Sequence, residues 1–195
     1  AEELVDPRPY CEIIRQWSTF HPEFAFLPRK FKIAVNAVEG ADRAATRMHD
    51  VGVHIIRNAA GDLGYRIYAG GGLGRTPILS SVIREFLPEE DLLTYLDAIV
   101  RVYNQFGRRD NKYKARIKIL VKALGPERFS ELVEAEWAHI KEGDGKLPSA
   151  ELERIKSHFT EPDYLALEAD PSSYTDALAA DKAFARWVER NVRAH

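Results

Sequence analysis

The chain is poor in residues that build cross-links or metal centres. Among its 195 residues there is one cysteine, Cys11. A single cysteine forms no intramolecular disulfide and cannot alone hold a zinc ion or an iron–sulfur cluster. The histidines show no spacing typical of a metal site, and mid-strand His54 is expected to be a core residue or one that supports a site from behind, rather than a metal ligand. The sequence therefore offers no metal ligands and no marked nucleophile.

Long apolar runs and an excess of one charge are also missing. No apolar stretch approaches the roughly 18 residues that span a membrane, and no signal peptide is recognised. Lys and Arg number 28 against 30 Asp and Glu, so the formal net charge of -2 gives no global attraction to nucleic acid or acidic membranes. Any basic site must be local. The composition is typical of a soluble globular protein, and a cytoplasmic location is expected.

Hydrophobic periodicity changes along the chain from that of strands to that of helices. The predicted strands are 29–38, 51–58 and 65–69, the last two as an antiparallel hairpin. The predicted helices are 9–17, 89–106, 111–124, 127–141, 174–192 and one that follows an N-cap at Ser149. Strands followed by helices indicate an α+β fold, a small mixed or antiparallel sheet covered by helices.

Three parts are expected along the chain. Residues 1–26 form an N-terminal lead-in, and residues 27–142 form the α+β domain. Residues 143–195 read as a helical C-terminal extension.

Two lysines stand close together in the stretch Leu27–Val35, "LPRKFKIAV", which opens the first predicted strand. Because alternate side chains of a strand share a face, Lys30 and Lys32 would point away from Phe31 and Ile33. Such lysines often face solvent or protect a sheet edge. Two adjacent cations also repel each other, so a site that keeps both gains from a small anion bound between them. The stretch alone leaves both interpretations open.

A glycine run follows the last predicted strand in "AGGGLGRTP". It contains Gly70, Gly71, Gly72 and Gly74. Glycine lets the backbone approach a ligand closely, and successive N–H groups can bind an anion. The stretch matches neither a P-loop nor the dinucleotide-binding fingerprint. A tight turn between two elements is the alternative explanation.

Cations flank the apolar stripe of the helix predicted at 111–124. On a helical wheel, one flank carries Arg109, Lys112 and Arg116, and the other carries Lys114, Lys118 and Lys122. Such a surface can bind a ligand with several carboxylates or phosphates, because arginine takes a carboxylate in bidentate fashion. Long cationic side chains beside a core are also explained as a solvated face.

In combination, these features resemble one known family. "LPRKFKIAV", "DVGVHIIRN…GYRIYAGGGLGRTP" and "FGRRDNKYKARIKILVKALGPERF" are similar, in order and spacing, to the sulfite reductase hemoprotein and ferredoxin-type nitrite reductase family. Each part alone is weak, and the combination is specific across about 27–130. Enzymes of this family reduce sulfite to sulfide, or nitrite to ammonia, with siroheme bridged to a 4Fe–4S cluster.

The resemblance implies roles for the basic residues and the glycines. Lys30 and Lys32 would belong to the cage of cations around the anion bound at the siroheme iron. The surface that faces the carboxylates of siroheme would comprise Gly70, Gly71, Gly72, Arg109, Lys112, Arg116 and Lys118. Further candidates are Arg29 and Arg57. No residue of this chain is predicted to bind a metal.

Other parts of the family pattern have no counterpart here. The family's cluster ligands are two cysteine pairs downstream of the matched region, and two arginines of the anion cage lie upstream. Near the C-terminus, "RWVERNV" resembles the lead-in to the family's second repeat. The expectation is a fragment with the first siroheme-binding domain of a longer reductase, inactive by itself and without bound cofactor. The parent enzyme would take electrons from ferredoxin or a flavoprotein.

Two other classes of function use the same residues. One is a small anion- or nucleic-acid-binding module without redox chemistry, which an aromatic stacking platform among the cations would favour. Tyr65 and Tyr68 fall on opposite faces of their predicted strand, which argues against such a platform. The other is a structural half-domain with no ligand of its own.

Overall fold

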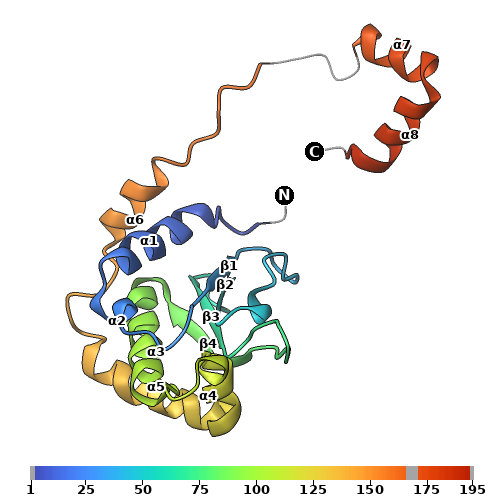
Figure 1. The fold of residues 1–195 in the computed structure, drawn as a ribbon. Helices are drawn as coiled ribbons and strands as arrows, with labels where there is room; N and C mark the ends of the chain where they lie inside the picture. Colours follow the sequence, from blue (N-terminus) through green and yellow to red (C-terminus); the bar gives the residue numbers. More distant parts are fainter. Residues whose placement is uncertain (1–2, 166–170, 194–195) are drawn as a thin grey trace. The chain divides into compact units, whose positions relative to one another are not determined.

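The structure, a computed structural model, describes residues 3–165 and 171–193. The chain divides into two units, one ending at Phe159 and one beginning at Thr160. Figure 1 shows the order of the elements in both units. Each unit is described by itself below.

The larger unit is built on a four-stranded sheet with the order β1-β2-β3-β4. Its strands are β1 (Ile33–Asn36), β2 (Val51–Arg57), β3 (Leu63–Ala69) and β4 (Ser81–Pro88). Strand β1 runs parallel to β2, whereas β2–β3 and β3–β4 are antiparallel pairs. The predicted α+β fold and the hairpin of β2 and β3 are confirmed, and the sheet is mixed.

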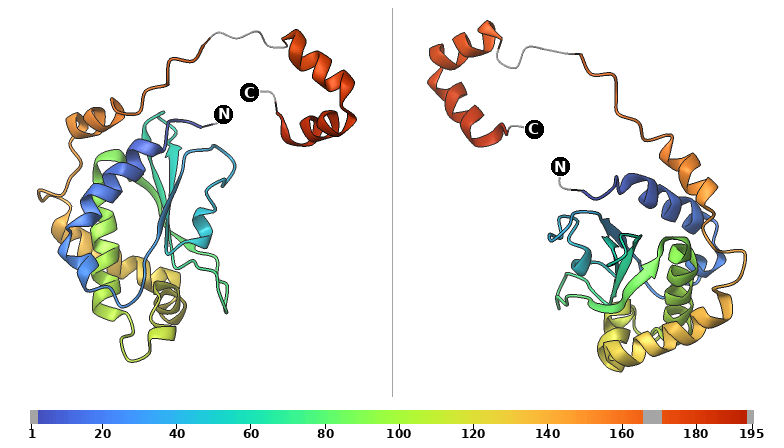
Figure 2. Two further views of the ribbon diagram at one scale, coloured as in Figure 1. Left: turned by 45° about the horizontal axis from the view of Figure 1, so that its top comes forward. Right: turned by 180° about the vertical axis from the view of Figure 1, so that it is seen from behind.

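Helices of this unit gather on one side of the sheet, as Figure 2 shows. They are α1 (Arg8–Thr19), α2 (Pro22–Ala25), α3 (Leu92–Phe106), α4 (Ile117–Leu124), α5 (Pro126–Ile140) and α6 (Ser149–Lys156). Short 3-10 turns add η1 (Thr46–Met48), η2 (Glu89–Asp91) and η3 (Lys112–Lys114). The site described below involves the ends of these elements rather than their middles.

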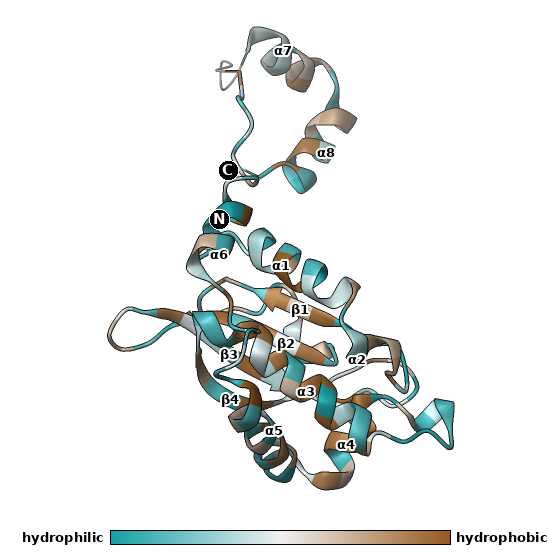
Figure 3. Cartoon of the chain, turned by 90° about the vertical axis from the view of Figure 1, so that its left-hand side faces the viewer, coloured by the Kyte–Doolittle hydropathy of each residue, from teal (hydrophilic) through white to brown (hydrophobic). Residues whose placement is uncertain are grey.

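The core lies between the sheet and α3. Apolar residues recur every three or four positions in α3, which turns one continuous stripe inward. The stripe consists of Leu92, Leu96, Ile99 and Tyr103, each at most 1% exposed. Facing it, the sheet contributes Val53, Ile55, Tyr65 and Ile67, equally buried. Figure 3 shows the hydrophobic stretches of the strands and of α3 in brown.

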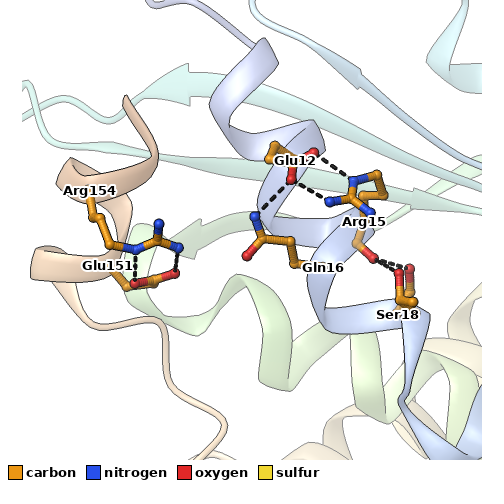
Figure 4. Close-up of polar contacts among 7 residues, drawn as sticks. Glu12, Arg15, Gln16, Ser18, Glu151 and Arg154 are labelled. Atoms are coloured by element: carbon orange, nitrogen blue, oxygen red, sulfur yellow. Dashed lines mark hydrogen bonds and ion pairs between the residues drawn. The ribbon is translucent and has the colours of Figure 1, made fainter. Parts of the chain in front are cut away.

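Polar contacts on α1 and α6 lie at the surface of the unit (Figure 4). Glu12 accepts hydrogen bonds from Arg15 at 2.7 and 2.6 Å and from Gln16 at 2.7 Å, which lowers the pKa of the Glu12 carboxyl. Glu151 binds Arg154 in the same bidentate way on α6. Exposed pairs of this kind add little stability, so the packing of the core sets the fold.

Several predicted boundaries are wrong. Strand β1 is shorter than the predicted 29–38, and β4 is absent from the prediction. Ser149 is the first residue of α6, not its N-cap, because the N-cap position is Pro148. The segment 111–124 contains a 3-10 turn followed by a helix that begins only at Ile117.

The C-terminal unit consists of two helices where the sequence predicts one. They are α7 (Ser172–Ala180) and α8 (Lys182–Asn191). Asp181 separates them and caps α8, because its carboxylate accepts the N–H groups of Ala183 at 2.8 Å and Phe184 at 3.0 Å. Phe184 packs edge-on against Tyr174, with ring centroids 6.3 Å apart.

Candidate cofactor and anion site

The three features singled out in the sequence meet at a buried carboxylate, Asp50. Its Oδ2 accepts the backbone N–H of Lys32 at 3.1 Å, and its Oδ1 accepts Nη2 of Arg116 at 2.7 Å and Nε at 3.1 Å. Its backbone carbonyl accepts the N–H of Gly70 at 3.0 Å. Asp50 thus connects three parts of the chain: the lysine segment (residues 26–35), the glycine loop (residues 70–78) and the start of α4.

The ion pair between Asp50 and Arg116 is largely shielded from water. The Asp50 side chain is 0% exposed and the Arg116 side chain 19%. Burial raises the pKa of the Asp50 carboxyl, and the hydrogen bonds from Arg116 and from the Lys32 amide act against that rise. A buried carboxylate that keeps its charge needs such partners. Arg116 therefore balances Asp50, and its charge is largely committed within the protein.

Lys30 and Lys32 lie just before β1 rather than in it. The reason is the Lys32 N–H, which donates to the Asp50 carboxylate instead of a neighbouring strand. Phe31, between the two lysines, stacks on Tyr103 with ring centroids 5.9 Å apart. Both lysine side chains are exposed. Within the described part of the chain, no hydrogen bond or ion pair engages either ammonium group.

Arg109 holds the lysine segment from its other end. Its Nη1 donates to the carbonyl of Phe26 at 2.8 Å, and its Nη2 donates to the carbonyl of Asn104 at 2.9 Å. Asn104 in turn donates to Glu23. Arg109 lies in the loop after α3, so its predicted place on the flank of a helix is wrong. Its guanidinium ties Phe26 to the end of α3.

Lys112 is also outside α4, in the 3-10 turn η3. Its side chain is exposed, and its ammonium group lies 5.3 Å from the centroid of the Tyr113 ring. The helical-wheel prediction fails for this residue as well, because the helix begins at Ile117. Lys112 and the neighbouring Lys114 are nevertheless exposed cations at the end of the segment that carries Arg116.

The glycine loop is packed against the turn η1. An added Cβ at Gly71 would lie 2.4 Å from the carbonyl oxygen of Arg47 and 2.5 Å from that of His49. The N–H of Gly72 donates to the carbonyl of Ile78 at 2.9 Å, and Gly70 donates to Asp50. Close packing therefore requires glycine at position 71. The N–H groups of Gly70 and Gly72 donate to carbonyl oxygens within the fold, so these two donors are not available to bind an anion.

Lys118 holds the same loop in place. Its Nζ donates to the carbonyl oxygens of Thr76 at 2.6 Å, Leu73 at 3.0 Å and Gly72 at 3.4 Å, and the residue is only 7% exposed. Burial lowers the pKa of the Lys118 ammonium, the Arg116 charge acts in the same direction, and Asp50 opposes both. Lys118 thus fixes the shape of the glycine loop.

Replacing Lys118 with methionine is expected to lower the free energy of unfolding by about 2 kcal/mol, because the loop carbonyls lose their charged donor. Amide hydrogen exchange in residues 70–78 should accelerate. Lys122→Met is the matched control, since Lys122 lies on the same helix with an exposed side chain. Equal effects of the two variants would contradict a role for Lys118 in holding the loop.

The two weaker arginine candidates lie in different places. Arg29 is exposed and directly precedes Lys30. Arg57 ends β2 and donates to the carbonyl of Gly61 at 2.8 Å, within the β2–β3 hairpin. It lines a surface cavity of about 400 Å³ with Arg66. The structure therefore does not bring Arg57 to the Asp50 cluster, because Asp50 and Arg57 flank opposite ends of β2.

Comparison with known proteins identifies the family. Residues 1–141 match the family described as "Nitrite and sulphite reductase 4Fe-4S domain". The chain belongs to this family. The resemblance noted in the sequence is thereby confirmed.

Relatives within the nitrite and sulphite reductase family are sulfite and nitrite reductases. Sulfite reductase (ferredoxin) 1 of Mycolicibacterium paratuberculosis is 32% identical over 148 residues, which cover 76% of this chain and 26% of the relative. The chloroplastic ferredoxin–nitrite reductase of Arabidopsis thaliana is 27% identical, over 80% of this chain and 25% of the relative. The chain thus spans about a quarter of the length of these relatives.

A solved structure supports the same assignment. The NirA protein of Mycobacterium tuberculosis superposes with a TM-score of 0.62 and 30% sequence identity, over 75% of this chain and 26% of that one. The match confirms the α+β fold. No helix in the described residues is long and apolar enough to cross a membrane.

The residues present fit one of the family's two prosthetic groups and not the other. The exposed ammonium groups of Lys30, Lys32 and Lys112 have the charge that suits the carboxylates of siroheme and a bound anion. A 4Fe–4S cluster needs several thiolates, and the sequence has Cys11 alone. The described residues also contain no cluster of His, Cys, Asp or Glu that could hold a metal ion.

Asp50 is not among the site residues predicted from the sequence. It ends the polar stretch 39–50, for which neither a strand nor a helix is predicted, and its partners Lys32 and Arg116 are far from it along the chain. The available signal is its position, an acid directly before the buried strand β2. His54 is partly buried, and its Nε2 lies 2.8 Å from Asn36 Nδ2 and 2.9 Å from the carbonyl of Val38, so its ring is engaged by polar groups of the fold.

Proposed function

We propose that this chain forms one wall of the active site of a siroheme-dependent sulfite or nitrite reductase. Lys30 and Lys32 bind the substrate anion, while the glycine loop and the segment 109–118 face the cofactor. The observation that carries the proposal is a pair of exposed ammonium groups, without partners among the described residues, on a segment whose backbone is fixed at Asp50. The sequence relationship to reductases supports the reaction class.

The two lysines have a direct chemical use in such a site. Each ammonium group carries three N–H donors and one positive charge, so the pair can neutralise and orient a small oxyanion. Removal of oxygen from sulfite or nitrite consumes protons, and an ammonium group hydrogen-bonded to a departing oxygen can supply one. Siroheme, when bound, supplies the iron that holds the anion and passes electrons to it. The chain's own residues bind, orient and protonate.

The proposal extends to the longer enzyme from which the chain would come, here called the parent enzyme. We infer that the chain is part of a longer reductase, because it lacks cluster ligands and matches about a quarter of its relatives' length. Alone it is not expected to reduce either anion. Ferredoxin is the proposed electron donor, since the names of several relatives contain it.

Nucleic acid is a weaker candidate ligand. Tyr65 is 1% exposed, so it offers no stacking surface beside the cations. Tyr68 lies on the other face of β3, away from the core. The exposed Tyr113 stands alone next to Lys112. An anion-binding role thus explains the arrangement better than a nucleic-acid interface.

A siroheme titration tests the proposal. The purified chain and the full-length parent are each titrated with siroheme, and binding is followed by Soret absorbance. Sulfite and nitrite are then added against chloride at equal ionic strength. We expect an anion-dependent spectral shift in the parent and weaker cofactor binding by the chain alone, because part of the pocket is missing. Failure of the folded parent to bind siroheme would refute the assignment.

A further inference from the structure

We propose that Asp50 is the positioning residue that sets Lys32 for the anion. The proposal rests on the function proposed above and adds a residue to that site. The Asp50 side chain is 0% exposed, so it is not placed to touch the substrate anion itself. It acts through the backbone of Lys32 and through Arg116.

The backbone of Lys32 is held on both sides. Its N–H donates to Asp50 Oδ2 at 3.1 Å, and its carbonyl accepts the N–H of Val51 at 3.1 Å. The two hydrogen bonds therefore fix the position of the Lys32 Cα, and with it the direction of the Cα–Cβ bond, relative to β2. Lys30 has no comparable backbone anchor among the described residues. The two lysines therefore differ in support, which makes Lys30 a built-in comparison.

Considered only as a charge, the Asp50 carboxylate would weaken anion binding, whereas as a positioning residue it would strengthen it. A carboxylate near an anion site repels the anion, and Arg116 compensates that repulsion with a bidentate contact. Neutralising Asp50 would free the Arg116 charge and, by Coulomb's law, tighten anion binding. If Asp50 serves to position Lys32, the same change weakens binding. The sign of the change therefore separates the two effects.

Asp50→Asn is the variant that shows whether anion affinity rises or falls when the charge of Asp50 is removed. An asparagine keeps the size of the side chain but has one carbonyl oxygen, whereas two groups of donors converge on Asp50. Its amide N–H₂ must then face either the Lys32 N–H or the Arg116 guanidinium. At least one of these hydrogen bonds is lost. The Lys32 N–H then either has no acceptor at residue 50 or competes with Arg116 for the one remaining oxygen.

The experiment is a pair of double-variant cycles in the full-length reductase. Sulfite affinity, measured from the shift of the siroheme spectrum, is determined for D50N in the wild-type, K32A and K30A backgrounds. We expect D50N to weaken sulfite binding on the order of tenfold, the size of one hydrogen bond to a charged group. The effect should vanish with K32A and persist with K30A.

A second readout does not depend on the cofactor. Hydrogen exchange at the Lys32 amide of the 195-residue chain should be slow in the wild type and faster in D50N. If D50N does not fold, D50N/R116Q removes both charges together and leaves the introduced amide carbonyl free to accept the Lys32 N–H. That double variant should regain slow exchange at the Lys32 amide.

The outcomes separate the two proposals. Tighter or unchanged sulfite binding in D50N, or equal coupling to Lys30 and Lys32, would overturn the positioning role while the proposed function stands. An enzyme whose wild type binds sulfite but loses nothing in K30A and K32A would overturn both. Unchanged exchange at the Lys32 amide in D50N would also reject the anchor, whatever the cofactor does.

Discussion

Alanine at both Lys30 and Lys32 is expected to lower the kcat/KM of the parent reductase for its anion by about 100-fold or more. Both ammonium groups are exposed and unpartnered among the described residues, so they are available to stabilise negative charge. In the proposed site, their removal would leave the anion with fewer donors and would make protonation of a departing oxygen harder. The fold should be unaffected, because the ammonium groups make no contact that it needs.

Steady-state kinetics with sulfite and nitrite measure this loss, and thermal unfolding checks the fold. Lys122→Ala/Lys182→Ala is the matched control, because it removes the same charge from two exposed lysines on α4 and α8. A loss of similar size in the control would mean that net charge, and not the lysine segment, attracts the anion. A drop in Tm with Lys30→Ala/Lys32→Ala alone would point to a structural role instead.

The hairpin of β2 and β3 could be predicted because its signals are local. Buried apolar residues fill both strands, and the turn between them carries Asn58 and Gly61. Strand β4 breaks the expected alternation. Arg84 lies on the helix side, where it pairs with Glu134 at 2.9 Å and stacks over Trp137 at 5.1 Å. A charged residue packed inward is a tertiary arrangement that no window of sequence reveals.

The helix predicted at 111–124 is too long for a similar reason. Apolar spacing continues through the segment, but Arg116 adopts an extended conformation, with φ -67° and ψ 149°. Its guanidinium reaches Asp50 from that position, and the helix can begin only at the next residue. A contact between distant residues thus overrides local helical preference. The division of α7 from α8 differs, since Asp181 is a recognisable N-cap signal.

In the candidate site, too, some residues could be predicted from the sequence and the roles of others could not. The paired lysines and the glycine run could be recognised because two lysines at the head of a predicted strand, and three consecutive glycines after another strand, are uncommon local patterns. The roles of Arg116 and Lys118 are not visible, since both side chains turn toward partners supplied by other segments. Among the residues that the resemblance assigns to the site, those with exposed ammonium groups are Lys30, Lys32 and Lys112. Arg109, Arg116 and Lys118 hold the site together.

Gly71→Ala is expected to lower the free energy of unfolding by about 3 kcal/mol, at the upper end of what overpacking costs. The new methyl group would meet the carbonyl oxygens of Arg47 and His49 at 2.4 and 2.5 Å. Both are backbone atoms, and the Arg47 carbonyl already accepts the N–H of Ser80 at 2.8 Å. The turn η1 must therefore shift as a whole.

Urea unfolding followed by far-UV circular dichroism measures the loss, with Gly74→Ala as the control from the same loop. Gly74 has φ 100° and open space where its Cβ would lie, so alanine there costs about 1 to 2 kcal/mol of backbone strain alone. Equal losses in the two variants would contradict the close approach at Gly71. Because Asp50 directly follows His49, a shifted turn also moves the anchor of Lys32. Gly71→Ala should therefore weaken anion binding in the parent enzyme as well as stability, whereas Gly74→Ala should change stability only.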